Sequence, residues 1–362
     1  MKRILSLDGG GIRGVFTLEL LLEMQTLLRE HYQNPKLVLR DHFDCFAGTS
    51  TGAIIATCLC WGMEVEDVLK LYTEVGGKMF QPLPWYQFVR KFLVTKFTAE
   101  PLTEILKNLF LDDETGQPAL LSSSRIKDKL LLVVVRNHTT GSAWPLTNNP
   151  LAKYNKLDRP DCNMKIPLWE LVRASTAAPT FFPPAEIMLG DTKQIFVDGS
   201  ITPYSNPAVI AALTATLPAY HVDWPTGPEK IRLVSVGTIQ FSSELPGSNP
   251  KLWVGYYAKQ IPTALLQTMG WQQDYICRCL GTCLYGEPLD GEIGDLIGVP
   301  NIFLHSWFSY VRYNQTYKKK EMEEILLRHP HLAEIDAIDA IPILSQVGKE
   351  YAAKHIKIEH LI

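Results

Sequence analysis

The sequence predicts an α/β fold, in which a mostly parallel central sheet carries helices on both faces. Along the first 240 residues, short aliphatic runs alternate with stretches of helical hydrophobic periodicity. Several of these runs end in glycine-containing turns, as expected where strands pass into crossover helices. Six consecutive aliphatic residues at 130–135 are typical of a strand buried on both faces of a parallel sheet.

The N-terminal quarter supplies two strand–turn–helix units. Residues 3–7 predict a buried strand that ends in three glycines, and residues 12–30 place apolar side chains at helical spacing. A second short strand is expected at 43–47. The almost wholly apolar stretch 53–61 follows it and predicts a helix buried on all sides.

Further elements continue the alternation after the strand at 130–135. Residues 167–178 predict a helix, which the prolines that follow would end. Short strands are expected at 194–197 and 231–236, with a helix at 205–216 between them. Alternating strands and helices imply crossover units and a three-layer architecture.

The character of the sequence changes after residue 240, so two parts are expected. Residues 1–240 form an α/β domain in this interpretation. Residues 241–362 are expected to form a mostly helical C-terminal layer packed on the sheet, for which a regulatory role is one interpretation. Within it, the aromatic stretch 303–317 is strand-like and residues 338–362 are helical.

Composition narrows the class of protein. The chain has 362 residues, of which 46% are hydrophobic and 20% charged, and its formal net charge is −3. These values exclude a disordered chain, a collagen-like repeat and a small disulfide scaffold. A net charge so close to zero does not indicate the basic surface that is typical of proteins that bind DNA or RNA.

Cysteine usage and hydropathy predict a cytoplasmic protein that contacts membranes only peripherally. The seven cysteines are odd in number and mostly lie in apolar runs, which is typical of reduced, buried thiols. Cys277, Cys279 and Cys283 cluster without histidines at zinc-finger spacing, so no metal site is expected. No stretch reaches the ~20 apolar residues of a membrane span, and the N-terminus lacks the apolar core of a signal peptide.

The first chemical motif is a glycine loop between an expected strand and helix. Gly9, Gly11 and Gly14 match G-x-G-x-x-G, with Gly10 and Arg13 between them. A dinucleotide-binding loop has this pattern, but it requires an acidic residue ~20 positions on that closes a second strand, and none fits well. A glycine turn at a helix N-terminus presents N–H groups to any anion, whether a pyrophosphate or an oxyanion.

The second motif predicts a nucleophile. Gly48 and Gly52 flank Ser50 in the pattern G-x-S-x-G, between a short strand and an apolar helix. This strand–turn–helix context is the one that a nucleophile elbow requires, and there the Thr51 N–H can face a developing oxyanion. The alternative is a helix-capping serine loop, which does not require glycine at both positions.

The third motif supplies a base for Ser50. No histidine after Ser50 stands at a strand end beside a glycine turn; His138, which follows the strand 130–135, is the best of them. Asp198, by contrast, closes the expected strand 194–197 and opens a turn with Gly199 and Ser200.

Together these motifs resemble the patatin-like phospholipase family. The resemblance rests on residues 8–14, 48–52 and 198–200 and on the segment 174–184, and it covers about residues 1–240. It implies a Ser50–Asp198 dyad, an oxyanion hole built by the glycine loop with Arg13 beside it, and no metal or required cofactor. Ser200 departs from the family, which more often has glycine or alanine after Asp-Gly.

The implied reaction is hydrolysis of lipid acyl esters. Asp198 would accept the Ser50 proton, and Ser50 would attack the ester carbonyl to form an acyl-enzyme. A basic and aromatic segment at 78–97 fits an anionic lipid surface and is expected to act as a membrane contact or lid; its central members are Trp85, Tyr86, Phe88, Arg90 and Lys91. The alternative is a segment that covers the core.

The length of the chain and the stretch Arg312-Tyr313-Asn314 also resemble a bacterial subgroup of this family, the anti-phage effectors that a cyclic di- or oligonucleotide activates. That resemblance implies a membrane phospholipid substrate, a cyclic nucleotide activator, a homodimer, and peripheral binding to the inner membrane when active. An unregulated lipase or esterase, a nucleotide-binding sensor without hydrolase activity and an inactive lipid-binding relative are the alternatives.

Overall fold

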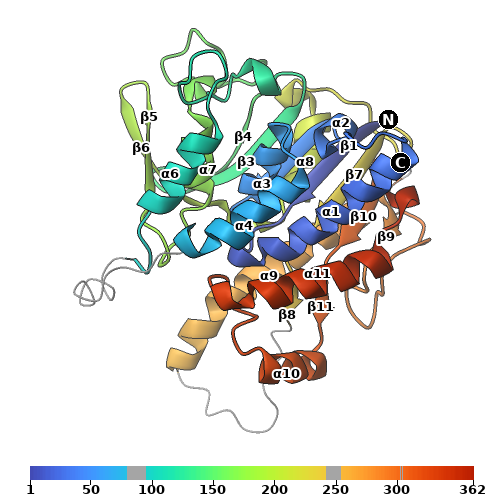
Figure 1. The fold of residues 1–362 in the computed structure, drawn as a ribbon. Helices are drawn as coiled ribbons and strands as arrows, with labels where there is room; N and C mark the ends of the chain where they lie inside the picture. Colours follow the sequence, from blue (N-terminus) through green and yellow to red (C-terminus); the bar gives the residue numbers. More distant parts are fainter. Residues whose placement is uncertain (80–94, 242–253, 302, 304) are drawn as a thin grey trace.

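A single twisted sheet organises the molecule (Figure 1). The computed structural model describes residues 1–79, 95–241, 254–301, 303 and 305–362. Within these residues the strand order is β5-β6-β3-β2-β1-β7-β10-β9, and β4 also pairs with β3. The strands are β1 Lys2–Leu7, β2 Cys45–Thr49, β3 Leu130–Asn137, β4 Ser142–Thr147, β5 Ala185–Leu189, β6 Thr192–Asp198, β7 Ile231–Val236, β9 Thr282–Tyr285 and β10 Ser309–Tyr313. A separate pair joins β8 (Gln240–Phe241) to β11 (Thr316–Tyr317).

The sheet is mostly parallel, as predicted. Strands β3, β2, β1, β7, β10 and β9 pair with one another in parallel, in that order, whereas β4 is antiparallel to β3. The strand expected at 194–197 is β6, and it runs antiparallel to β3 instead of joining a crossover unit. It follows β5 in a tight hairpin in which Leu189 pairs with Thr192, and a hairpin reverses the chain direction.

Helices cover both faces of the sheet, also as predicted (Figure 1). Along β1, Leu5 and Leu7 face a core with helices α1, α3 and α11, while Ile4 faces a second core with α8 and Cys277 of α9. This alternation is the period of two that a strand imposes on its side chains. The helices are α1 Gly14–His31, α2 Leu39–His42, α3 Thr51–Cys60, α4 Val65–Met79, α6 Glu100–Leu109, α7 Leu168–Ser175, α8 Ala208–Thr216, α9 Val254–Leu280, α10 Lys319–Arg328 and α11 Ile341–His355.

The sheet continues across the expected boundary at residue 240. β10 pairs with β7, and β9 pairs with β10, so residues from the C-terminal part extend the sheet as well as covering it. The aromatic stretch at 303–317 contains β10, where Tyr310 and Tyr313 are fully buried. Helix α11 packs along α1 (Figure 1). No helix in the described ranges is both long and apolar enough to cross a bilayer.

Candidate active site

Ser50 stands on a sharp turn between β2 and α3. Its backbone has φ of 54° and ψ of −123°, a conformation that a residue with a side chain rarely adopts. A Cβ atom on Gly48 would overlap the Gly52 carbonyl, and one on Gly52 would overlap the Leu7 carbonyl. Glycine at both positions therefore allows the strand and the helix to touch backbone to backbone, and holds the serine at the strand ends.

Asp198, the last residue of β6, contacts Ser50 directly. The Ser50 hydroxyl donates to Asp198 Oδ2 at 2.6 Å. Asp198 Oδ1 accepts the N–H of Ser200 at 2.7 Å, which fixes the orientation of the carboxylate. Because the contact is direct, no histidine lies between the two residues; His138 is exposed in the turn after β3.

Burial tunes the carboxylate toward acting as a base. Asp198 is only 2% exposed, and desolvation raises its pKa to about 6. Hydrogen bonds from Ser50 and Ser200, together with the positive charge of Arg173, limit the rise. A carboxyl group with this pKa is ionised at neutral pH but binds a proton more strongly than an exposed aspartate.

The end of α7 ties both residues in place. Ser175 Oγ accepts the Ser50 N–H at 2.9 Å and donates to the Val134 carbonyl at 2.7 Å. The Asp198 N–H donates to the Ala177 carbonyl at 3.0 Å. Sequence reasoning gave Ser175 no role, although a hydroxyl at the end of an otherwise apolar helix face was a usable signal.

The glycine loop lies beside the Ser50 side chain. A Cβ on Gly9 would come within 3.3 Å of Ser50 Cβ and would overlap Ser200 Oγ. The Gly9 N–H donates to the Ser205 carbonyl, whereas within the described residues the N–H groups of Gly10 and Gly11 have no acceptor. Gly11 has φ of 61°, which favours glycine. Unused N–H donors in a loop that adjoins a serine are the elements from which an oxyanion hole can be built.

Arg13 is a partly buried cation beside this loop, and Gly14 after it begins α1. Its Nε donates to the Gly10 carbonyl at 3.3 Å. Burial lowers its pKa to about 10, so it remains protonated at neutral pH. No carboxylate in the described part of the chain lies within ion-pair distance of Arg13. Within the described residues, the guanidinium is thus without an ion-pair partner beside the glycine loop.

Other sequence predictions do not meet at this site. The expected membrane or lid residues Trp85, Tyr86, Phe88, Arg90 and Lys91 lie outside the described residues. In the cysteine cluster, Cys277 and Cys283 are buried, and desolvation raises the pKa of both thiols. Throughout the described ranges, no group of three or more His, Cys, Asp or Glu side chains is placed to hold a metal.

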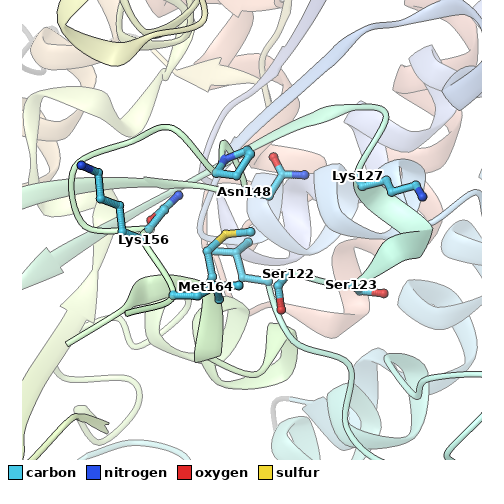
Figure 2. Close-up of a pocket in the computed structure, with 10 residues that line it drawn as sticks. Ser122, Ser123, Lys127, Asn148, Lys156 and Met164 are labelled. Atoms are coloured by element: carbon cyan, nitrogen blue, oxygen red, sulfur yellow. The ribbon is translucent and has the colours of Figure 1, made fainter. Parts of the chain in front are cut away.

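One cavity in the described part of the chain lies away from Ser50. Its volume is about 450 Å³. Figure 2 shows its lining by Ser122, Ser123, Lys127, Asn148, Lys156 and Met164. Asn148 accepts the N–H of Leu131, near the start of β3, whereas Asp198 pairs with Val135 toward the end of that strand. The cavity and the Ser50–Asp198 pair therefore lie toward opposite ends of β3.

The fold and this geometry define a class of protein: an α/β chain whose elbow serine pairs directly with an aspartate, beside a glycine loop with free N–H donors. Comparison with known proteins identifies the family within this class. The model of the patatin-like phospholipase family matches residues 5–212, more than half of the chain. The chain belongs to this family.

Several curated proteins are similar over the same region. Patatin-17 of Solanum cardiophyllum is 26% identical over 66% of this chain and 60% of its own length. A cGAMP-activated phospholipase of Escherichia coli is 26% identical over 70% of this chain and 67% of its own. A protein of that name from Vibrio cholerae is 26% identical over 66% of this chain and 64% of its own length. The chain thus spans about two thirds or less of these relatives.

Among solved structures, that of VipD from Legionella pneumophila aligns with 96% of this chain over 67% of the VipD chain. The TM-score is 0.37 and the sequence identity is 15%.

Proposed function

We propose that this protein is a lipid acyl hydrolase that cleaves fatty-acyl esters of phospholipids through Ser50 and Asp198. The observation that carries the proposal is the 2.6 Å hydrogen bond from the Ser50 hydroxyl to a buried carboxylate, at an elbow that strains the serine backbone. Membership of the patatin-like phospholipase family supports the same reaction class.

The geometry suggests a two-step reaction. Asp198 takes the proton of Ser50 while Oγ attacks the ester carbonyl, and the alcohol leaves with that proton as an acyl-serine forms. Water, deprotonated by Asp198, then releases the fatty acid and restores the serine. The N–H groups of Gly10, Gly11 and Thr51 are the candidates to hold the negative oxygen in both steps. An aspartate is a weak acid for an amine leaving group, so esters suit this pair better than amides.

Arg13 is proposed to bind the phosphate of the substrate or to support the oxyanion. Its partly buried guanidinium, which has no ion-pair partner among the described residues, supports both roles. The two roles differ in their substrate dependence. Arg13→Met is expected to impair hydrolysis of a phospholipid much more than that of a neutral short-chain ester if Arg13 binds phosphate, and both equally if it supports the oxyanion.

The first experiment compares fatty-acid release from phospholipid vesicles by the wild type and by Ser50→Ala. A fluorophosphonate probe, which reacts with activated serines, gives a second readout that needs no lipid. Labelling of the wild type but not of the variant would support the proposed nucleophile. Equal fatty-acid release by both proteins would exclude it.

We further propose that a cyclic di- or oligonucleotide activates the enzyme in anti-phage defence. The support comes from two relatives that are named cGAMP-activated phospholipases. An activator can act only through a difference in affinity between two states, and ~100-fold activation needs about 2.7 kcal/mol of coupling. Full activity on vesicles without nucleotide, unchanged by a panel of cyclic nucleotides, would favour the alternative of an unregulated lipase.

Membrane contact, dimerisation and location belong to the same proposal. The enzyme would be cytoplasmic and homodimeric and would bind the inner membrane peripherally when active, with the segment around Trp85 and Phe88 as its contact. Replacing both residues by serine is expected to impair action on vesicles more than on a soluble short-chain ester, because only vesicle hydrolysis requires docking. Equal effects on the two substrates would exclude a docking role.

A further inference from the structure

A buried ion pair joins the glycine loop to the C-terminal part of the chain. Arg312 donates to both carboxylate oxygens of Asp8, at 2.9 Å and 2.6 Å, and also to Ser235 Oγ at 2.7 Å. Asp8 is 9% exposed and Arg312 is 4% exposed. Two parallel N–H bonds fix the planes of both groups, which a single contact does not do.

The position of the pair links it to catalysis. Asp8 directly follows β1 and directly precedes Gly9, the first residue of the glycine loop. Arg312 lies on β10, where it pairs with Ser235 of β7, and Ser235 pairs in turn with Ser6 of β1. The guanidinium therefore reaches across β7 to hold the point where β1 turns into the loop.

Other anchors of the loop also come mainly from later in the chain. Thr238 Oγ1 donates to the Gly9 carbonyl at 3.0 Å, and the Ile12 N–H donates to the Ile335 carbonyl at 2.8 Å. A Cβ on Gly10 would overlap the side chain of Thr238. Residues beyond the segment that matches the family model thus shape the loop from several sides.

We propose that Arg312 is a positioning residue, which holds the glycine loop through Asp8 so that the Gly10 and Gly11 N–H groups face the oxygen that becomes negative during the reaction. This inference rests on the proposed hydrolase function. It deepens that function, because it assigns part of the oxyanion hole's geometry to the C-terminal part of the chain.

Burial makes the pair sensitive to small changes. Desolvation raises the pKa of Asp8, and the charge and hydrogen bonds of Arg312 act against that rise. The pKa of Arg312 is in turn raised by Asp8. A lysine at position 312 would keep the charge but not the two parallel N–H bonds, so Arg312→Lys tests geometry rather than charge alone.

Kinetics on a soluble short-chain ester provide the first test. The oxyanion exists only along the reaction path, so Arg312→Lys is expected to lower kcat about 10–100-fold and to leave KM within about twofold. Asp8→Asn, which keeps the shape of the side chain, is expected to have the same signature. A merely structural role predicts a lower melting temperature with kcat per folded molecule unchanged, and that result would overturn the proposal.

Hydrogen exchange gives a test that does not depend on activity. In Arg312→Lys, amide exchange in a peptide covering residues 8–14 is expected to rise at least tenfold, with little change in one covering residues 48–56. The control is Arg29→Lys, which weakens a partly buried ion pair with Glu66, at the far end of α1 from the glycine loop. This control should leave exchange in 8–14 unchanged. Unchanged exchange there in Arg312→Lys would refute the positioning role. If the wild type does not hydrolyse esters but exchange still increases in Arg312→Lys, only the hydrolase function is refuted.

Discussion

Ser50 and Asp198 approach each other from strands that run in opposite directions along β3. Thr49, before the serine, pairs with Val134, and Asp198 pairs with the next residue, Val135. β2 and β6 therefore flank β3 on its two sides, run in opposite directions and end at adjacent positions along it. The contact between hydroxyl and carboxylate is set by sheet register, which rigid backbone hydrogen bonds maintain, and not by a flexible loop.

This arrangement predicts that the two residues act as one unit. Ser50→Ala and Asp198→Asn are each expected to lower kcat by at least about 10³-fold, and the double variant should be no worse than Ser50→Ala alone. Circular dichroism should show that all three proteins remain folded. Independent, multiplicative losses in the double variant would contradict a shared step.

The pKa of Asp198 predicts an acidic limit to activity. The carboxyl must be ionised to accept the Ser50 proton, so kcat/KM should rise with pH through about 6 and then level off. Ser200 lowers the pKa of Asp198 through its side chain as well as its N–H. Ser200→Ala is therefore expected to move this rise in kcat/KM to higher pH. If the rise stays at the same pH, it reports the titration of another group.

The buried carboxyl group of Asp198 is also predicted to lower the stability of the folded protein at high pH. The pKa of Asp198 is higher in the folded chain than in the unfolded one, so its contribution to stability is present at low pH and is lost as the pH rises through about 6. At pH 8 the charged carboxylate is buried, which costs up to about 3 kcal/mol. Asp198→Asn should therefore have a higher melting temperature than the wild type at pH 8, and the gap should narrow at pH 5. An equal gap at both pH values would argue against this origin.

Ser175 is predicted to support the nucleophile without touching substrate. Ser175→Ala leaves the Ser50 N–H and the Val134 carbonyl without their buried partner, which should cost about 1–3 kcal/mol and also lower kcat. Thr176→Ala is the matched control, because Thr176 bonds only carbonyls of its own helix. If both variants lose stability but keep full kcat, Ser175 is structural only.

The elbow glycines are predicted to tolerate no side chain. In Gly52→Ala, the new Cβ would meet the backbone carbonyls of Leu7 and Asp8, which cannot move without disturbing β1. Low soluble yield or a large drop in melting temperature is expected. Gly77→Ala on α4 is the control, since a Cβ there meets no described atom within 4 Å and alanine favours helix. A stable, active Gly52→Ala enzyme would contradict the backbone contact.

Much of the site could be predicted because its motifs are local. Glycine spacing around Ser50, together with the strand before it and the helix after it, predicted the elbow without knowledge of any distant contact. Asp198 was identified because it ends a strand and begins a turn. The antiparallel course of β6 was not predicted, although the Gly190-Asp191 pair between β5 and β6 is a hairpin signal, because the strand before it was not recognised.

The sequence by itself predicted the strand and helix on either side of Ser50, the nucleophile turn, the acidic partner and the glycine loop, since each depends on residues close together in the chain. Only the tertiary structure decided the pairing of Asp8 with Arg312, 304 positions apart. Burial of β10 in the sheet forces the Arg312 side chain to find an internal counter-charge. Which counter-charge it finds depends on strand order, and strand order is a property of the whole fold.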